Sequence, residues 1–183
     1  MKSIAHDISS LPARFRDKQG RRITVQAFRT KDFDALVQMY DTFEPKGTEC
    51  GLPPRDPGMR MAWLRDVTKE LFNILAWNRG RVIGHCAIDL ARKDSCPEYL
   101  IFLRQGFRNR GIGTFLCEVM KSVAGEVGCK KVVVTVRTAN TRAVKVFQKV
   151  GFVFCGDIAA ERDMQLLIKP GRSCRRCHED ERD

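Results

Sequence analysis

The sequence predicts a mixed α/β domain of the α+β kind, with one sheet of six or seven strands and about four helices. Three observations predict it. Short apolar segments that alternate or run together lie between turn residues, which is typical of strands. Residues 112–127 carry apolar side chains at three- and four-residue steps, which indicates an amphipathic helix of about four turns. Residues 130–137 are nearly continuous valine, as in a strand that is buried on both faces at the centre of a sheet.

Length and charge set limits on the class of protein. At 183 residues the chain suits one domain and is long enough to bury a substantial core. The formal net charge of +11 favours an anionic partner such as nucleic acid, acidic protein or an anionic cofactor. The basic residues are scattered, however, and no aromatic residues interleave with them as single-strand binding requires. We therefore favour a solvated surface over a nucleic-acid interface.

The chain divides into three parts. Residues 1–20 mix Ser, Pro, Arg, Lys and Gly without periodicity, and we interpret them as a leader that is partly ordered at most. They show no apolar stretch of a signal peptide, and no segment approaches the ~20 apolar residues of a membrane span. Residues 21–169 form the predicted domain, and residues 170–183 form a charged tail. We expect the reducing cytoplasm, where thiols such as Cys86, Cys117 and Cys155 act as small buried hydrophobes.

The first elements of the domain are a strand at residues 22–29 and a helix that Asp32 can cap. Residues 44–58 follow as a loop, because four prolines and three glycines cannot sustain a helix or a strand. Helical spacing resumes at residues 59–71. The next two strands, at residues 72–77 and 81–90, form a hairpin whose turn is the triplet at residues 78–80.

The remaining elements begin with a strand at residues 99–103. The long helix ends at Gly128, and the valine strand follows it. Asn140 is a good N-cap for a short helix, and Gly151 is a good stop. Two final strands occupy residues 152–157 and 161–168.

Residues 104–114 read Arg-Gln-Gly-Phe-Arg-Asn-Arg-Gly-Ile-Gly-Thr and connect a strand to the long helix. Glycines let the backbone approach a ligand, and the first helical turn presents N–H groups without intrachain partners. The helix dipole, Arg108 and Arg110 then favour a diphosphate. The segment lacks the Gly-Lys-Ser/Thr of a Walker loop and meets only part of a dinucleotide fingerprint. A tight turn without a ligand is the alternative.

A second stretch, residues 138–152, follows the valine strand. Its distinctive residues are Asn140, Ala143, Phe147, Gly151 and Phe152. Together with Arg108-x-x-Gly111-x-Gly113, it resembles the two signature motifs of the GNAT superfamily, the Gcn5-related N-acetyltransferases. The resemblance extends from about Thr24 to Leu167. It implies the GNAT fold, with residues 21–169 as an acyl-CoA-binding domain, and leaves the acceptor open.

The resemblance also implies how acetyl-CoA is held as co-substrate. The diphosphate would lie on the main chain of residues 108–114, and Asn140 would contact the pantetheine arm from a facing loop. The arm would pair with a strand edge at Ile101 and Leu103, and the Leu103 N–H would polarise the thioester carbonyl. The implied cofactor-binding residues are Ile101, Leu103, Arg108, Asn109, Arg110, Gly111, Ile112, Gly113, Thr114, Asn140, Ala143 and Phe147.

The general base has three candidates. Many GNAT enzymes use a glutamate near the start of the strand before the glycine motif, and Glu98 is nearest to that position. A plain exposed carboxylate is the alternative interpretation of Glu98. Asp89 and His85 lie on the neighbouring strand. His85 would suit a proton shuttle near neutral pH, although a histidine in a strand is more often structural.

Phe147 departs from the family pattern. Seven residues after the asparagine, many GNAT enzymes carry a tyrosine that protonates the departing thiolate, and phenylalanine has no proton to give. Either another group or water serves, or catalysis is slow, or the site binds acyl-CoA without efficient turnover.

The tail contains Cys174-Arg-Arg-Cys177-His178, the spelling of a c-type haem attachment site. Haem attachment requires export, which the N-terminus does not support, and a zinc site would need further ligands. We favour an inert or redox-sensitive tail and assign no metal ligand.

The sequence therefore predicts an N-acetyltransferase. It would transfer the acetyl group of acetyl-CoA to a primary amine of a small molecule, peptide or protein lysine by direct attack on the thioester. By resemblance, residues 44–58 would help to select the acceptor, with a plain connector as the alternative. A weakly catalytic or non-catalytic acyl-CoA sensor is the first alternative function, and a basic nucleic-acid-binding protein is the second. Homodimers are common in such folds, but the sequence carries no interface signal.

Overall fold

Two antiparallel sheets form the framework of the computed structural model, which describes residues 8–48, 51–92 and 97–168. The first sheet has the order β1-β2-β3-β4-β5 and contains β1 (Ala13–Arg16), β2 (Arg22–Ala27), β3 (Phe72–Asn78), β4 (Arg81–Ile88) and β5 (Tyr99–Leu103). The second has the order β6-β8-β7 and contains β6 (Lys131–Arg137), β7 (Val153–Cys155) and β8 (Glu161–Leu167). The predicted α/β class is confirmed, but the described strands lie in two sheets rather than one.

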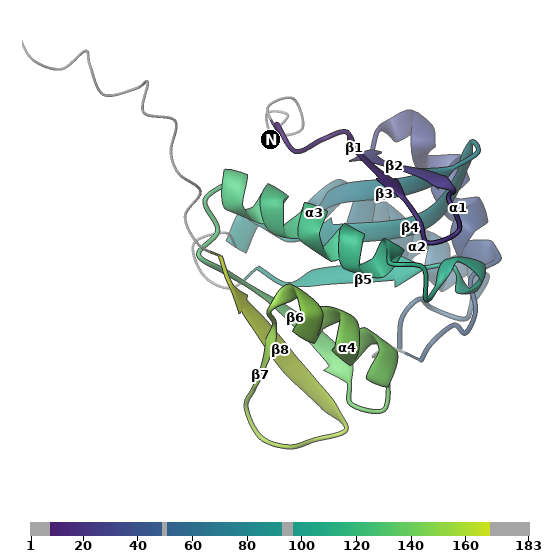
Figure 1. Ribbon diagram of the computed structural model, residues 1–183. Helices are drawn as coiled ribbons and strands as arrows, with labels where there is room; N and C mark the ends of the chain where they lie inside the picture. The colour runs from purple at the N-terminus through teal and green to yellow at the C-terminus, as the bar shows by residue number, and fades with distance from the viewer. Residues whose placement is uncertain (1–7, 49–50, 93–96, 169–183) are drawn as a thin grey trace, which may run out of the picture.

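The two sheets join near the start of β5. Glu98 forms a parallel bridge with Val133, and the N–H of Val133 donates to the carbonyl oxygen of Pro97 at 2.9 Å. Beyond this join β5 and β6 belong to different sheets, and Figure 1 shows them separating. The two strands are therefore joined near their N-terminal ends and lie apart at their C-terminal ends.

Four helices cover the described sheets. Helices α1 (Phe33–Asp41) and α2 (Pro57–Glu70) lie on one face, and α3 (Ile112–Glu126) and α4 (Thr141–Val150) lie on the other (Figure 1). Side chains alternate along a strand, so Phe102 of β5 packs with α1 and α2. Its neighbour Ile101 packs with α3 and α4. Strand β5 thus contributes to both cores.

Helix ends follow local sequence signals. Asp56 caps α2 by accepting the N–H of Met59 at 2.7 Å. Asn140 caps α4 by accepting the N–H of Ala143 at 3.2 Å, as predicted. Asp32 occupies the N-cap position of α1, as predicted, but its side chain makes no capping bond: its carboxylate instead accepts the N–H of Arg29 at 3.0 Å, within a 3-10 turn that precedes α1. A turn thus replaces a direct start of the helix.

Strand β6 corrects a second expectation. It is an edge strand of its sheet, and its valines alternate between buried and half-buried positions. Val132, Val134 and Val136 face the core, whereas Val133 and Thr135 face the other way. A continuous valine segment suits a strand between two neighbours, but here β5 turns away and leaves one side of β6 open.

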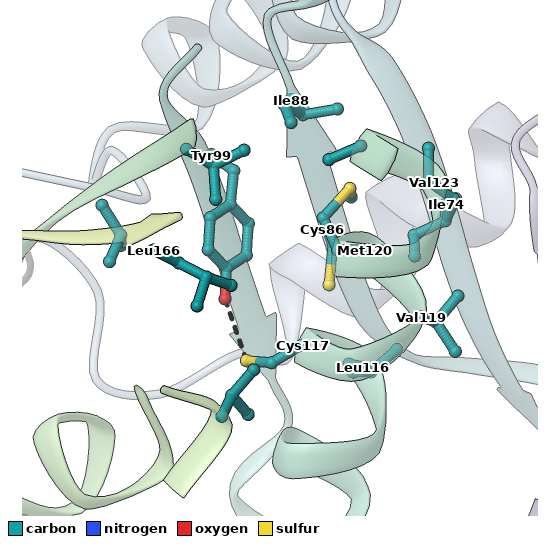
Figure 2. Packing of buried hydrophobic residues seen from close by; sticks show 14 of the residues in the cluster. Ile74, Cys86, Ile88, Tyr99, Leu116, Cys117, Val119, Met120, Val123 and Leu166 are labelled. Atoms are coloured by element: carbon teal, nitrogen blue, oxygen red, sulfur yellow. Dashed lines mark hydrogen bonds between the residues drawn. The ribbon is translucent and has the colours of Figure 1, made fainter. Parts of the chain in front are cut away.

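Helix α3 is fixed firmly to the first sheet. Figure 2 shows its apolar side chains, Leu116, Cys117, Val119, Met120 and Val123, beside residues of β3, β4 and β5. The hydroxyl of Tyr99 and the thiol of Cys117 lie 2.9 Å apart (Figure 2). Cys86 and Cys117 are buried free thiols, as predicted, and burial raises the pKa of both. The same prediction is wrong for Cys155, which is only half-buried because it lies in the short edge strand β7. Such packing holds the start of α3 in a defined position.

The first strand lies within residues 1–20, the predicted leader. All four residues of β1 pair with β2, and the ring of Phe15 stacks on that of Phe115 in α3, with centroids 4.7 Å apart. Short, polar strands carry a weak pattern, which is why this one is not evident from the sequence. Within the described ranges, no helix has the length and apolar content to cross a membrane.

Candidate active site

A cleft of about 720 Å³ opens where β5 and β6 diverge. We call it the β5–β6 cleft. Its volume is in the range of small-molecule sites. One wall comes from β5, residues 108–114 and the start of α3; the facing wall comes from residues 137–149, which include most of α4. Residues 43–48, after α1, contribute a third side. The two glycine-containing motifs of the sequence thus face each other across one space.

The start of α3 forms the anion-binding end of the cleft. Gly111 has φ +84°, in the left-handed region, and a Cβ there would lie 3.2 Å from Phe15 Cζ. The backbone conformation therefore favours glycine, and a side chain here would also crowd the Phe15 ring. The first turn of α3 contains no acidic residue. Its N–H groups and helix dipole consequently remain available to a negatively charged ligand.

The electrostatic character of the cleft is uniformly basic. Five cationic side chains, and no carboxylate, are found among the described residues that line it. They are Lys18, Arg108, Arg137, Arg142 and Lys149. Like charges gathered around a concave surface raise the local concentration of anions. Part of the net charge of +11 is thus concentrated at this site.

The edge of β5 that borders the cleft offers main-chain groups to a ligand. On the other edge, Arg104 N–H donates to Ile83 C=O at 2.9 Å, and Asp89 N–H donates to Glu98 C=O at 3.1 Å. Antiparallel bonding alternates along a strand, so the N–H groups of Ile101 and Leu103 point away from β4, toward the cleft. An extended ligand can therefore pair with β5 as a strand would.

The sequence matches a known protein family. The family model described as "Acetyltransferase (GNAT) family" matches residues 33–152 of the sequence. The chain belongs to this family. No curated protein matches the sequence.

Solved structures agree with this GNAT assignment at the level of the fold. The GNAT domain of S. lividans PAT has a TM-score of 0.74 at 18% identity, over 85% of this chain and 96% of that one. A phosphinothricin acetyltransferase from Sinorhizobium meliloti, in complex with AcCoA, has a TM-score of 0.64 at 17% identity. The match covers 82% of this chain and 94% of that one. The ribosomal-protein-S18-alanine N-acetyltransferase from Escherichia coli has a TM-score of 0.64 at 14% identity. The match covers 83% of this chain and 98% of that one.

Most of the residues that the GNAT resemblance implies for the cofactor line the β5–β6 cleft. They are Ile101, Leu103, Arg108, Asn109, Gly111, Gly113, Thr114, Asn140, Ala143 and Phe147. The side chains of two others do not. Ile112 is fully buried in the core. Arg110 turns away, with Nη1 3.7 Å from Asp17 Oδ2 and its guanidinium 5.5 Å from the centre of the Phe107 ring. These two residues can therefore serve a ligand only through their main chain.

Two arginines hold residues 43–48 over the cleft. Arg108 donates from Nε to Leu103 C=O at 3.1 Å and from Nη2 to Glu44 C=O at 3.2 Å. From the facing wall, Arg137 Nη1 donates to Thr48 C=O at 3.0 Å. Sequence reasoning missed Arg137. Its place directly before the second GNAT motif, at the end of a predicted strand, is a signal that could have found it.

His85 does not fit the role of a proton shuttle. It is fully buried, and Nε2 lies 2.8 Å from Asn73 Oδ1. Asn73 Nδ2 donates to two carbonyls, those of Val67 and Leu71, so its Oδ1 faces His85 and accepts from Nε2–H. Nδ1 then accepts the Tyr40 hydroxyl at 2.8 Å. Burial lowers the pKa of His85 to about 3, so the ring is a neutral structural group.

The two candidate carboxylates lie near the join of the sheets. Glu98 is exposed, and its Oε1 lies 3.3 Å from Thr135 Oγ1, which also lies 2.8 Å from Asp163 Oδ1. Glu98 lies five positions before Leu103, which is about 16 Å along an extended strand. Asp89 is half-buried and accepts the N–H of Ala91 at 3.1 Å. Neither carboxylate lines the cleft.

Phe147 lines the cleft but is almost wholly buried, at 3% exposure. Its ring packs against Tyr99 and Phe152, with centroids 6.1 and 5.5 Å away. It therefore provides an apolar wall and no proton. Among the described residues, no group of three or more His, Cys, Asp or Glu side chains could hold a metal ion. The Cys174, Cys177 and His178 motif lies outside the described residues.

Proposed function

We propose that this GNAT protein is an N-acetyltransferase that transfers the acetyl group of acetyl-CoA to a primary amine of a small molecule, peptide or protein lysine. The observation that carries the proposal is the β5–β6 cleft, in which a glycine loop at a helix N-terminus, five cations and an open strand edge surround one space. A diphosphate joined to an amide-containing arm is complementary to that combination. We also infer a cytoplasmic location, which suits free thiols such as Cys86 and Cys117.

In the proposed complex, main-chain N–H groups of residues 108–114 hold the diphosphate. The pantetheine arm lies along β5, where Ile101 presents main-chain groups to its amides. The N–H of Leu103 is the proposed donor to the thioester carbonyl. A donor aimed at that oxygen stabilises the negative charge that develops when the carbonyl carbon becomes tetrahedral. Asn140 and Ala143 form the opposite side of the arm's path.

The reaction is a direct acyl transfer. The amine nitrogen attacks the thioester carbonyl carbon, the C–N bond forms, and the C–S bond breaks as the electron pair leaves with sulfur. We propose Glu98 as the base. It lies about 16 Å along the strand from Leu103 and outside the cleft lining, so the extra proton of the nitrogen reaches it through a chain of several waters. It shares a strand face with Phe102, which lines the cleft, and its carboxylate is exposed. Water protonates the departing thiolate, because Phe147 has no acidic hydrogen.

The absence of a hydroxyl at Phe147 favours one alternative, an acyl-CoA sensor that binds without efficient turnover. A general acid typically contributes about 10²- to 10⁴-fold to a rate. A thiolate needs such help less than most leaving groups, since thiols ionise with a pKa of about 8.5. We therefore rank the enzyme above the sensor.

The experiment that tests the proposal has two readouts. Acetyl-CoA binding is measured by calorimetry, and release of free thiol is followed with a panel of amino acids, polyamines and lysine peptides. Binding together with amine-dependent release supports the enzyme. Binding without release for the whole panel, above the rate of hydrolysis, favours the sensor. Failure to bind acetyl-CoA would remove both.

A further inference from the structure

The turn between β1 and β2 lies against the glycine loop. The N–H of Lys18 donates to the carbonyl oxygen of Arg110 at 3.3 Å. Phe15 of β1 lies beside Gly111 and stacks on Phe115 in the first turn of α3. The β1–β2 hairpin therefore contacts both the glycine loop and the first turn of α3, which follows that loop. These contacts place residues 15–18 at the anion-binding end of the cleft.

Asp17 fixes both the turn and Arg110. Its side chain is fully buried, and Oδ1 accepts the N–H groups of Gln19 and Arg21, both at 2.9 Å. Burial would raise the pKa of this carboxyl, but the N–H groups of Arg21 and Gln19 and the charge of Arg110 outweigh it, so its pKa lies below the usual value. The ionised carboxylate holds Arg110 at 3.7 Å and balances its charge. One of the two arginines that the glycine motif offers to a diphosphate, Arg110, is thus already engaged.

Lys18 is in a different position. It is exposed, lines the β5–β6 cleft, and has no carboxylate partner among the described residues. Its backbone is held by the bond to Arg110, so the side chain starts from a fixed point beside the loop. The GNAT match covers residues 33–152, and Lys18 lies before it. The family pattern therefore says nothing of this residue.

We propose that Lys18 is a cofactor-binding residue whose ammonium group contacts the diphosphate of the CoA moiety, in the place that the glycine motif would give to Arg110. The proposal rests on the proposed function, since it assumes that acetyl-CoA occupies the cleft. It makes the N-terminal hairpin part of the cofactor site: Asp17 and Phe15 position the loop, and Lys18 supplies the charge.

The test compares dissociation constants of the full chain and its variants by calorimetry. The ligands are acetyl-CoA and an acetyl-CoA analogue without the 3′-phosphate. Lys18→Ala loses one charged contact, so its dissociation constant should rise about five- to tenfold for both ligands. Lys18→Arg should stay within about twofold of the parent protein, because the charge is kept. The control is Lys69→Ala, at a side chain that is 81% exposed on α2, and it should bind as the parent does.

Four outcomes would overturn the proposal, and they are distinguishable. Equal binding by Lys18→Ala and the parent would show that the ammonium contacts no phosphate. A loss seen with acetyl-CoA but not with the 3′-dephospho analogue would assign Lys18 to the 3′-phosphate instead. A loss in Lys18→Arg as large as in Lys18→Ala would indicate a role of backbone or packing rather than charge. Failure of the parent protein to bind either ligand would remove the proposed function itself.

Discussion

The guanidinium of Arg108 lies 5.5 Å from the centre of the Phe43 ring. The same side chain bonds the carbonyls of Leu103 and Glu44. Leu103 ends β5, whereas Phe43 and Glu44 begin the loop that covers the cleft. One arginine therefore connects the strand edge proposed for the cofactor to the loop proposed for the acceptor.

Replacing Arg108 with alanine should raise the KM for the amine acceptor more than it weakens acetyl-CoA binding. The change removes the hydrogen bond to Glu44 and the cation–π contact with Phe43, which hold residues 43–48, and also the bond to Leu103; together they are worth about 1–3 kcal/mol. Steady-state kinetics at saturating acetyl-CoA, with calorimetry for the cofactor, separates the two effects. Arg65→Ala, on the exposed side of α2, is the control. An unchanged acceptor KM in Arg108→Ala would show that the contact with the loop is without consequence.

Gly111→Ala should weaken both stability and cofactor binding. Its φ of +84° strains any L side chain, and the new Cβ would lie 3.2 Å from Phe15 Cζ. We expect the free energy of unfolding to fall by about 1–2 kcal/mol. Movement of the loop should raise the Kd for acetyl-CoA about tenfold, that is by about 1.4 kcal/mol.

Urea unfolding and calorimetry measure these two quantities. Gly106→Ala is a matched control in the same loop, because a Cβ there meets nothing within 4 Å and its φ is not left-handed. Equal behaviour of the two variants would contradict the requirement for glycine at 111.

Glu98→Gln should lower kcat about 10²-fold at neutral pH without changing the Kd for acetyl-CoA. The amide cannot take a proton from the attacking nitrogen. The defect should shrink at high pH, where bulk solvent deprotonates the amine. Asp163→Asn is the matched control, since Asp163 contacts the same Thr135 hydroxyl. If Asp163→Asn showed the pH-dependent loss and Glu98→Gln did not, the role of base would pass to Asp163.

His85 should make the protein less stable as the pH falls. The unfolded chain binds a proton on this ring near pH 6.5, whereas the folded protein does so only at about 3. Between those values the unfolded state holds more protons, so this contribution is complete above pH 6.5 and is lost progressively toward pH 3. Its size is on the order of a few kcal/mol.

Urea unfolding from pH 7 to pH 4 should therefore show a steeper decline for the parent protein than for His85→Gln. Glutamine can still donate to Asn73 and accept from Tyr40, but it does not titrate. Parallel pH profiles of the two proteins would mean that His85 is not held neutral.

Local signals in the sequence were sufficient for most elements and for the two motifs of the site. Gly111 marks the start of α3, and Asn140 and Gly151 mark the ends of α4, because each depends on a few neighbouring residues. The open side of β6 and the position of Lys18 depend on partners far away in the chain. No local pattern shows that β5 leaves β6, or that Asp17 reaches Arg110 across 93 positions.

The same distinction explains His85. Alternation on β4 places it on one face of the strand, but the identity of its partners, Tyr40 and Asn73, comes from α1 and β3. A histidine that is saturated by neighbours looks identical in sequence to one that faces a substrate.

The join of the two sheets at Glu98 and Val133 also decides what can enter the space beside β5. A strand edge on an outer rim would accept another sheet and invite aggregation. Here β6 and α4 stand opposite the edge across the cleft, so a second sheet that approached β5 would meet them first, whereas an extended ligand inside the cleft lies directly beside the edge.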